Sequence, residues 1–309
     1  MSNRTLAASI TRLASKQTYY TVRCLVDRDL IPDGYRAYAY FRWLDDRLDH
    51  GGMEKSDRAV LVARQTGLID QCYRGAWPRD LADAEHLLVG LIRGDHEKNS
   101  GLQAYVRNMM AVMAFDADRR DRLISQAELA EYSRLLATAV TEALHYFIGH
   151  DCPPPHSDAR YLAATAAHIT HMLRDTLEDN AAGYFNIPRE FLEAHGITPH
   201  AVESEAYRVW IQSRVRLARD YFEAGKRYLA RVENLRCRLA GYAYMARFEA
   251  VLTTIERDGY RLRSAYQDDN GLEAALGLGG SVLSLALSRN REGSMLRSTG
   301  QMNPSKEEV

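Results

Sequence analysis

The chain has 309 residues, with 40 Lys and Arg against 41 Asp and Glu, and a formal net charge of −1. A chain of this length can bury a large core in a single domain. Its balanced charge excludes the strongly basic surface that is typical of nucleic-acid-binding proteins. The four cysteines are widely separated, so the sequence predicts reduced thiols rather than a disulfide framework or a zinc site.

The apolar segments of the sequence argue against a membrane-spanning protein. Residues 1–11 lack the long apolar segment of a signal peptide. The most apolar late segment, Ala274 to Leu287, is too short to cross a bilayer. We therefore expect a cytoplasmic protein, and peripheral contact with a membrane stays open.

Long tracts rich in Ala, Leu, Arg and Glu predict helices along the chain. Apolar residues recur every three or four positions over Leu123–Ile148 and Ala206–Val232, which is the period of an amphipathic helix. The run Pro153–Pro155 separates two helices. We find neither an alternating strand pattern nor an internal repeat. The sequence thus predicts a single all-α domain over residues 1–289, followed by a polar, disordered tail over residues 290–309.

Two aspartate clusters lie within the predicted helices. The first contains Asp45 and Asp49, and the second contains Asp175 and Asp179. In each pair the residues are four positions apart, so on a helix their carboxylates share one face, about 6 Å from each other. Like charges at this spacing weaken a helix, and Mg²⁺ relieves the repulsion because it bridges carboxylates to substrate phosphates. The clusters therefore predict a magnesium site that binds a diphosphate.

A single pair of aspartates four residues apart is more often a solvated helix face than a binding site. Here the pattern occurs twice within apolar helices, and an arginine closely precedes each pair, namely Arg42 and Arg174. A guanidinium forms paired hydrogen bonds with phosphate oxygens, so these two arginines are candidate diphosphate contacts.

The two clusters also resemble those of a known family. Tyr38–Asp49 is similar to the first aspartate motif of squalene and phytoene synthases, and Met172–Asp179, followed by Gly183 and Ile187-Pro188, is similar to the second. This resemblance implies an all-α helical bundle of the isoprenoid-synthase type around a central cavity. It also implies a reaction in which two allylic diphosphates, farnesyl or geranylgeranyl, join head to head through a cyclopropyl intermediate. Mg²⁺ assists the departure of diphosphate in this family.

The resemblance implies roles for individual residues of the two motifs. The implied metal ligands are Asp45, Asp46, Asp49, Asp175, Glu178 and Asp179. Asp46 and Glu178 are auxiliary in this assignment, and Arg42 and Arg174 contact the diphosphate. The predicted catalytic residues are Asp45, Asp49, Asp175, Asp179 and His171.

The chain departs from the family pattern at several positions near the motifs. Three residues before Arg174 the family usually has asparagine, and this chain has His171. After the glycine that follows the second motif the family usually has a basic residue, and this chain has Tyr184. Arg134 or Leu135 lies near the place of a family tyrosine. Because the aspartates of both motifs are kept while these neighbouring positions differ, the resemblance supports the reaction class more than a particular product.

His168 and His171 lie on the same helical stripe as Asp175 and Asp179. One interpretation is that both imidazoles line the cavity or bond to neighbouring groups. Another is that one of them moves a proton or contacts the diphosphate, because histidine titrates near neutral pH. A transition-metal site is the weakest interpretation, since the surrounding ligands are hard oxygens.

The sequence therefore predicts a Mg²⁺-dependent prenyltransferase that condenses two isoprenoid diphosphates head to head. One alternative is a related ionisation-initiated reaction, such as terpene cyclisation or prenyl transfer to another acceptor. The other is a non-catalytic relative, against which the intact aspartates argue because a scaffold has no need of repelling carboxylates. Substrate chain length, the exact product, NADPH use and the oligomeric state stay open.

Overall fold

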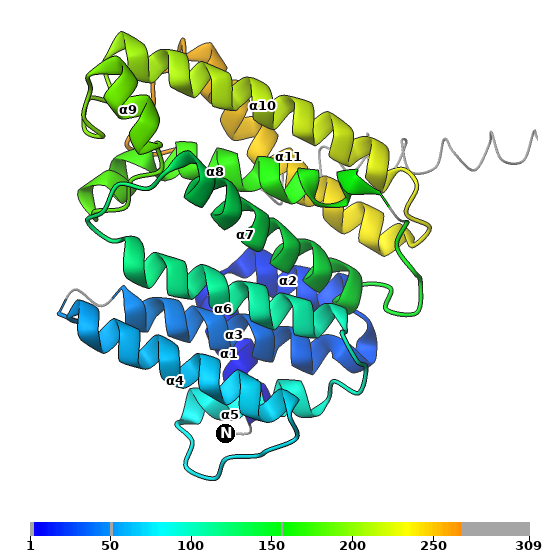
Figure 1. The fold of residues 1–309 in the computed structure, drawn as a ribbon. Helices are drawn as coiled ribbons and strands as arrows, with labels where there is room; N and C mark the ends of the chain where they lie inside the picture. The colour runs from blue at the N-terminus through cyan, green and yellow to red at the C-terminus, as the bar shows by residue number, and fades with distance from the viewer. Residues whose placement is uncertain (1–2, 50–51, 156, 267–309) are drawn as a thin grey trace, which may run out of the picture. The chain divides into compact units, whose positions relative to one another are not determined.

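The computed structural model describes residues 3–49, 52–155 and 157–266 (Figure 1). These residues form helices and no β-strand, as predicted. The α-helices are α1 (Asn3–Ala14), α2 (Lys16–Leu25), α3 (Ile31–Leu48), α4 (Lys55–Tyr73), α5 (Asp83–Arg93), α6 (Gly101–Arg119), α7 (Gln126–Phe147), α8 (Leu162–Ala181), α9 (Arg189–His195), α10 (Glu205–Leu229) and α11 (Leu235–Arg257). The 3-10 helices are η1 (Arg28–Leu30) and η2 (Asp158–Tyr161). The domain predicted for residues 1–289 can be followed to Tyr266, and the predicted tail, residues 290–309, lies outside the described residues.

Two amphipathic helices form where the apolar period predicts them, as α7 and α10. Each begins at a serine whose hydroxyl accepts a hydrogen bond from a backbone N–H of the first turn. In α7 the Glu128 carboxylate also accepts from the Ser125 N–H at 2.7 Å, which completes a capping box. None of the described helices combines the length and the apolar character that a bilayer span requires.

Six of the helices form a closed ring of pairwise contacts. Around this six-helix ring α3 contacts α6, α6 contacts α7, α7 contacts α8, α8 contacts α11, α11 contacts α2, and α2 contacts α3. The helices that carry the aspartates, α3 and α8, are therefore on opposite sides of the ring. Outside the ring, α4 and α5 pack on α3 and α6, while α10 packs on α8 and α11. Tyr40 and Leu44 of α3, and Ile169 and Leu173 of α8, are fully buried and fix the rotation of the two helices.

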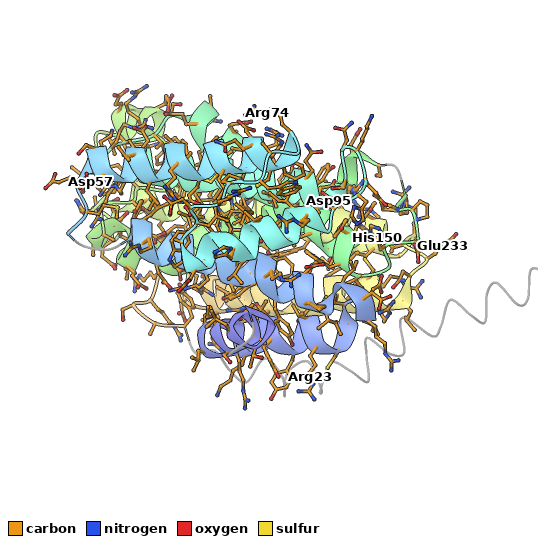
Figure 2. All side chains as sticks on the ribbon, turned by 90° about the horizontal axis from the view of Figure 1, so that it is seen from below. Arg23, Asp57, Arg74, Asp95, His150 and Glu233 are labelled. Atoms are coloured by element: carbon orange, nitrogen blue, oxygen red, sulfur yellow. The ribbon has the colours of Figure 1, made fainter. Side chains whose placement is uncertain are left out.

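The helices α3, α6 and α8 begin at one end of the ring. Near the start of α3, the Asp27 carboxylate accepts hydrogen bonds from the backbone N–H groups of Gly149 and His150, which follow α7. His150 lies beside Asp95 in Figure 2, and its Nε2 is 3.2 Å from the Glu97 carboxylate, just before α6. Asp57, at the start of α4, lies at the opposite end in this view.

The same three helices end together at the other end of the ring, on the left of Figure 1. After α6, the Asp121 N–H donates to the carbonyl of Gly183, just after α8, at 2.8 Å. Lys55 Nζ, from the first residue of α4, is 2.9 Å from the Asp118 carboxylate of α6. Because the C-terminus of a helix carries a partial negative charge, three such ends together favour a cation.

A glycine allows α10 to approach α8 closely. A Cβ added to Gly225 would lie 2.6 Å from Cβ and 3.1 Å from Cα of Ala163, closer than side chains pack. Since α8 carries the second aspartate cluster, this crossing helps to set where that cluster lies. By contrast, a Cβ on Gly67 in α4 would meet nothing within 4 Å.

We expect Gly225→Ala to lower the free energy of unfolding by about 1–3 kcal/mol, because the added methyl forces α8 and α10 apart. Gly67→Ala is the control, and it should raise stability by up to about 1 kcal/mol through helix propensity alone. Urea denaturation of both variants measures the difference. Equal effects of the two substitutions would contradict the close packing of α8 on α10.

Candidate functional site

The structure brings the four predicted aspartates to one end of the six-helix ring. Asp45 lies in the last turn of α3 and Asp49 caps its C-terminus, while Asp175 and Asp179 lie in the last two turns of α8. The Tyr184 hydroxyl, from the loop after α8, donates a hydrogen bond to Asp49 Oδ1 at 3.2 Å. The two clusters therefore belong to one site, although they are more than 120 residues apart in sequence.

The two predicted diphosphate contacts lie beside the aspartates and are bonded to them. Arg42 forms an ion pair with Asp46, and its Nη1 is 3.7 Å from Asp45 Oδ2. Arg174 donates to both oxygens of Asp175, through Nε at 2.6 Å and Nη2 at 2.8 Å. Each guanidinium therefore already uses part of its five N–H donors on a carboxylate.

The two auxiliary acidic residues lie at the margin of the site. The Asp46 side chain is 54% exposed, and Glu178 is also exposed. Asp49 is exposed as well, so exposure alone does not separate the auxiliary carboxylates from the other predicted ligands. Their role as auxiliary ligands stays a prediction.

A buried arginine that carries no sequence motif lies between the two clusters. Arg119, the last residue of α6, is 4% exposed. Its Nε donates to Asp116 Oδ1 at 2.7 Å and its Nη1 donates to Asn186 Oδ1 at 2.8 Å. The Tyr132 hydroxyl donates to the other oxygen of Asp116 at 3.0 Å. We name Asp116, Arg119, Tyr132 and Asn186 the Arg119 network.

The Arg119 network reaches the second aspartate cluster. Asn186 Nδ2 donates to Asp179 Oδ2 at 2.7 Å, which completes a chain of hydrogen bonds from Asp116 to Asp179. The Tyr184 ring, whose hydroxyl bonds to Asp49, lies 5.2 Å from the Arg119 guanidinium. Sequence reasoning missed the residues of the Arg119 network, because their contacts join α6 to α7 and to the loop after α8.

The surroundings of the half-buried carboxylates disfavour the ionised form of these groups. Burial and the neighbouring carboxylate of Asp49 raise the pKa of Asp45 to about 6. Burial and Asp175 likewise raise the pKa of Asp179 to about 6, against the opposing charge of Arg119. Burial also raises the pKa of Asp116. A divalent cation would relieve each of these penalties.

Asp175 differs from the other aspartates of the site. Burial raises its pKa, but hydrogen bonds from Arg174 and His171 outweigh burial and hold the pKa below its usual range. His171 Nε2 is 2.9 Å from Asp175 Oδ2, and its side chain is 51% exposed. Asp175 is therefore already ionised and oriented before any metal binds.

His168 lies deeper than His171 on the same face of α8. It is 4% exposed, and its ring meets the Tyr132 ring edge-on with 4.7 Å between centroids. Burial, followed by the charge of His171, lowers the pKa of His168 to about 3, so the imidazole is neutral at physiological pH. The geometry favours a packing role for His168, one of the two interpretations left open by the sequence.

The carboxylates fit a metal ion that is shared with a substrate. Within the described ranges, no three His, Cys, Asp or Glu side chains lie close enough to hold a metal ion alone. Mg²⁺ rarely needs such a cage, since it keeps several waters and takes further oxygens from substrate phosphates. The hard oxygen donors and the raised pKa values of Asp45 and Asp179 suit this kind of binding.

A surface cavity lies away from the aspartates. It has a volume of about 380 Å³ and is lined by Ala159, Ala224, Arg227, Tyr228 and Arg231, near the start of α8. Asp175 is three to four helical turns further along α8, or roughly 20 Å. The space for a prenyl chain beside the aspartates stays a prediction.

Comparison with known proteins places this arrangement in a family. A profile of squalene/phytoene synthases matches residues 12–269. The chain belongs to this family. A presqualene diphosphate synthase of Rhodopseudomonas palustris is 27% identical over 191 residues, which are 60% of this chain and only 63% of that relative.

Solved structures of related enzymes share the fold. A squalene synthase from Alicyclobacillus acidocaldarius matches with a TM-score of 0.66 and 21% identity, over 84% of this chain and 95% of the other. A dehydrosqualene synthase solved with a ligand matches with a TM-score of 0.71 and 17% identity, over 93% and 97% of the two chains. The isoprenoid-synthase fold that the resemblance implied is thereby confirmed.

We expect Asp179→Asn to stabilise the metal-free protein near neutral pH. A raised folded pKa means that ionisation of Asp179 destabilises the fold above the unfolded pKa, so removing the charge should gain roughly 1–2 kcal/mol at about pH 7.5 and less at about pH 5. Asparagine can still accept the Asn186 hydrogen bond. Thermal unfolding in a chelating buffer at both pH values measures the gain.

Asp175→Asn is the matched control, because the pKa of Asp175 is shifted the other way. A depressed folded pKa contributes stability above the unfolded pKa, and this stability is lost as the pH falls. Asp175→Asn should therefore destabilise the metal-free protein near neutral pH. A gain in stability for Asp175→Asn would contradict the assignment of opposite shifts to the two aspartates.

Proposed function

We propose that the protein is a Mg²⁺-dependent prenyltransferase that condenses two allylic isoprenoid diphosphates, farnesyl or geranylgeranyl, head to head. The observation that carries the proposal is the meeting of both aspartate clusters, from opposite sides of the six-helix ring, through Tyr184 and the Arg119 network. Membership of the squalene/phytoene synthase family supports the reaction class.

The proposal assigns each charged group of the site a task. Asp45, Asp49, Asp175 and Asp179 would hold Mg²⁺, with Asp46 and Glu178 at the margin. The bound metal would neutralise the charge that develops on the departing diphosphate. Three helix C-termini surround this place and favour the cation.

The arginines of the site can change hydrogen-bond partners when the substrate binds. A diphosphate offers more oxygen acceptors than a carboxylate, so Arg42 and Arg174 can leave their aspartates and form charge-assisted hydrogen bonds with it. Their release of Asp45 and Asp175 frees carboxylate oxygens for the metal. Binding of metal and binding of diphosphate are then mutually supportive.

A second candidate is a different ionisation-initiated reaction on the same scaffold. Near the place of a family tyrosine, Arg134 is 59% exposed and pairs with Glu131 at 2.7 Å, so it does not reach the aspartates. Tyr132, two residues earlier, is buried and bonds to Asp116 instead. A changed aromatic group near the reacting carbons would favour a changed product. Product identification by mass spectrometry decides between the two candidates.

We expect Asp45→Ala and Asp175→Ala to reduce pyrophosphate release from farnesyl or geranylgeranyl diphosphate by at least about 100-fold, because each removes a ligand of Mg²⁺. The measurement is enzymatic detection of pyrophosphate with and without Mg²⁺. The control is Asp70→Ala, which removes a surface carboxylate that pairs with Arg107 at 2.9 Å. Full activity of either site variant would remove that cluster from the chemistry.

His171→Asn restores the residue usual in the family and removes the contact with Asp175. If the imidazole acts as an acid or base, we expect the variant to shift the pH–rate profile or to change the product. Pyrophosphate release across pH and product analysis are the two measurements. If both stay the same while KM or stability changes modestly, His171 only orients Asp175.

A further inference from the structure

Arg119 is a buried cation that has hydrogen-bond partners and aromatic neighbours in both halves of the site. Its Nε and Nη1 bond to Asp116 and Asn186, and the rings of Tyr132 and Tyr184 lie 4.7 and 5.2 Å from its guanidinium. Burying a cation is costly unless it is paired and hydrogen-bonded, so this position needs a compensating gain. Nothing in the aspartate motifs accounts for it.

On the α3 side, Arg119 acts through Asp116. The charges of Asp45 and Asp49 both interact with that of Asp116, which raises the pKa of Asp45 further. Arg119 neutralises Asp116, and it therefore limits the repulsion that the first cluster experiences. Tyr184, whose ring packs on Arg119, holds Asp49 directly.

On the α8 side, Arg119 acts through Asn186. The Asn186 amide oxygen accepts from Arg119, and this fixes the amide so that its NH₂ group points to Asp179 Oδ2. Because the oxygen and the nitrogen of the Asn186 amide both bond to protein groups, the amide has a single orientation. Its bond to Oδ2 then also fixes the direction in which Oδ1 of Asp179 points. Asn186 is 4% exposed, so these bonds lie largely out of contact with solvent.

We propose that Arg119 is a positioning residue that couples the two aspartate clusters and sets Asp179 in place for a metal–diphosphate complex. This inference rests on the proposed function. The bonded nitrogens Nε and Nη1 of Arg119 and its contacts with the rings of Phe115, Tyr132 and Tyr184 are all with protein groups, so it acts through Asp116 and Asn186. Hydrogen-bond partners of ligating carboxylates typically change metal affinity by about 10–100-fold when they are removed.

A purely structural role would have a different signature. Arg119 joins the end of α6 to the loop after α8, so its loss would lower thermal stability in any case. If that were all, metal affinity measured well below the melting temperature would be unchanged. The informative quantity is therefore Mg²⁺ affinity in the folded protein.

Two substitutions separate the hydrogen-bonded link from Asn186 to Asp179 from the buried charge of Arg119. Asn186→Ala breaks the link to Asp179 and leaves the ion pair of Arg119 with Asp116 intact. Arg119→Lys keeps the charge and loses the fork that bonds Asp116 and Asn186 together. Arg107→Gln is the control, because it removes one positive charge from the same helix at a surface ion pair.

The test is calorimetric titration of Mg²⁺ into the full chain in the presence of inorganic pyrophosphate. We expect Asn186→Ala and Arg119→Lys to weaken Mg²⁺ binding by about 10-fold or more, and Arg107→Gln to leave it unchanged. Thermal unfolding confirms that each variant is folded at the titration temperature. Where Arg119→Lys fails to fold, Asn186→Ala decides.

The outcomes distinguish this inference from the proposed function. Unchanged affinity in Asn186→Ala, when the unaltered protein binds Mg²⁺ and pyrophosphate, would overturn the role of Arg119 and leave the proposed function in place. Absence of binding in the unaltered protein would overturn both. Weakened binding in Asn186→Ala, in a protein that releases no pyrophosphate from isoprenoid diphosphates, would support the role of Arg119 and count against the proposed reaction.

Discussion

Half-buried carboxylates repel one another, and in this protein the repulsion lies where α3, α6 and α8 end. The partial negative charges of three helix C-termini add to it. The metal-free fold tolerates this arrangement because cations are interleaved with the carboxylates: Arg42 beside Asp46, Arg174 beside Asp175, and Arg119 beside Asp116. In the proposed function, a divalent cation would relieve this penalty, which the folded chain already carries.

The rest of the fold fixes the positions of the carboxylates relative to one another. Buried side chains of α3 and α8 fix the rotation of the two helices, and Gly225 lets α10 press against α8. Gly183 has φ +85°, and a Cβ there would lie 2.1 Å from an oxygen of Asp121, so only glycine fits the turn after α8. That turn carries Tyr184 and Asn186 back to Asp49 and Asp179.

Helical period and aspartate spacing were enough to predict the fold class and the two clusters, because both depend on contacts within one or two turns. The Arg119 network was not predictable in this way. Asp116 and Arg119 form an ion pair three residues apart, and so do Glu131 and Arg134. The first pair is buried and the second is exposed, and only the packing of α6 against the loop after α8 separates them.

Two departures from the family pattern coincide with hydrogen bonds to the carboxylates. His171 bonds to Asp175 in the second cluster, and Tyr184 bonds to Asp49 in the first. A basic residue in place of Tyr184 would bring a positive charge to the site, and here the Arg119 and Arg120 guanidiniums lie 5.2 and 6.0 Å from the centre of the Tyr184 ring. In the proposed function, the positive charge near Tyr184 would therefore come from α6 and the residue after it, and the metal would still hold the diphosphate. The sequence departures thus change how the charge of the site is balanced while the aspartates themselves are retained.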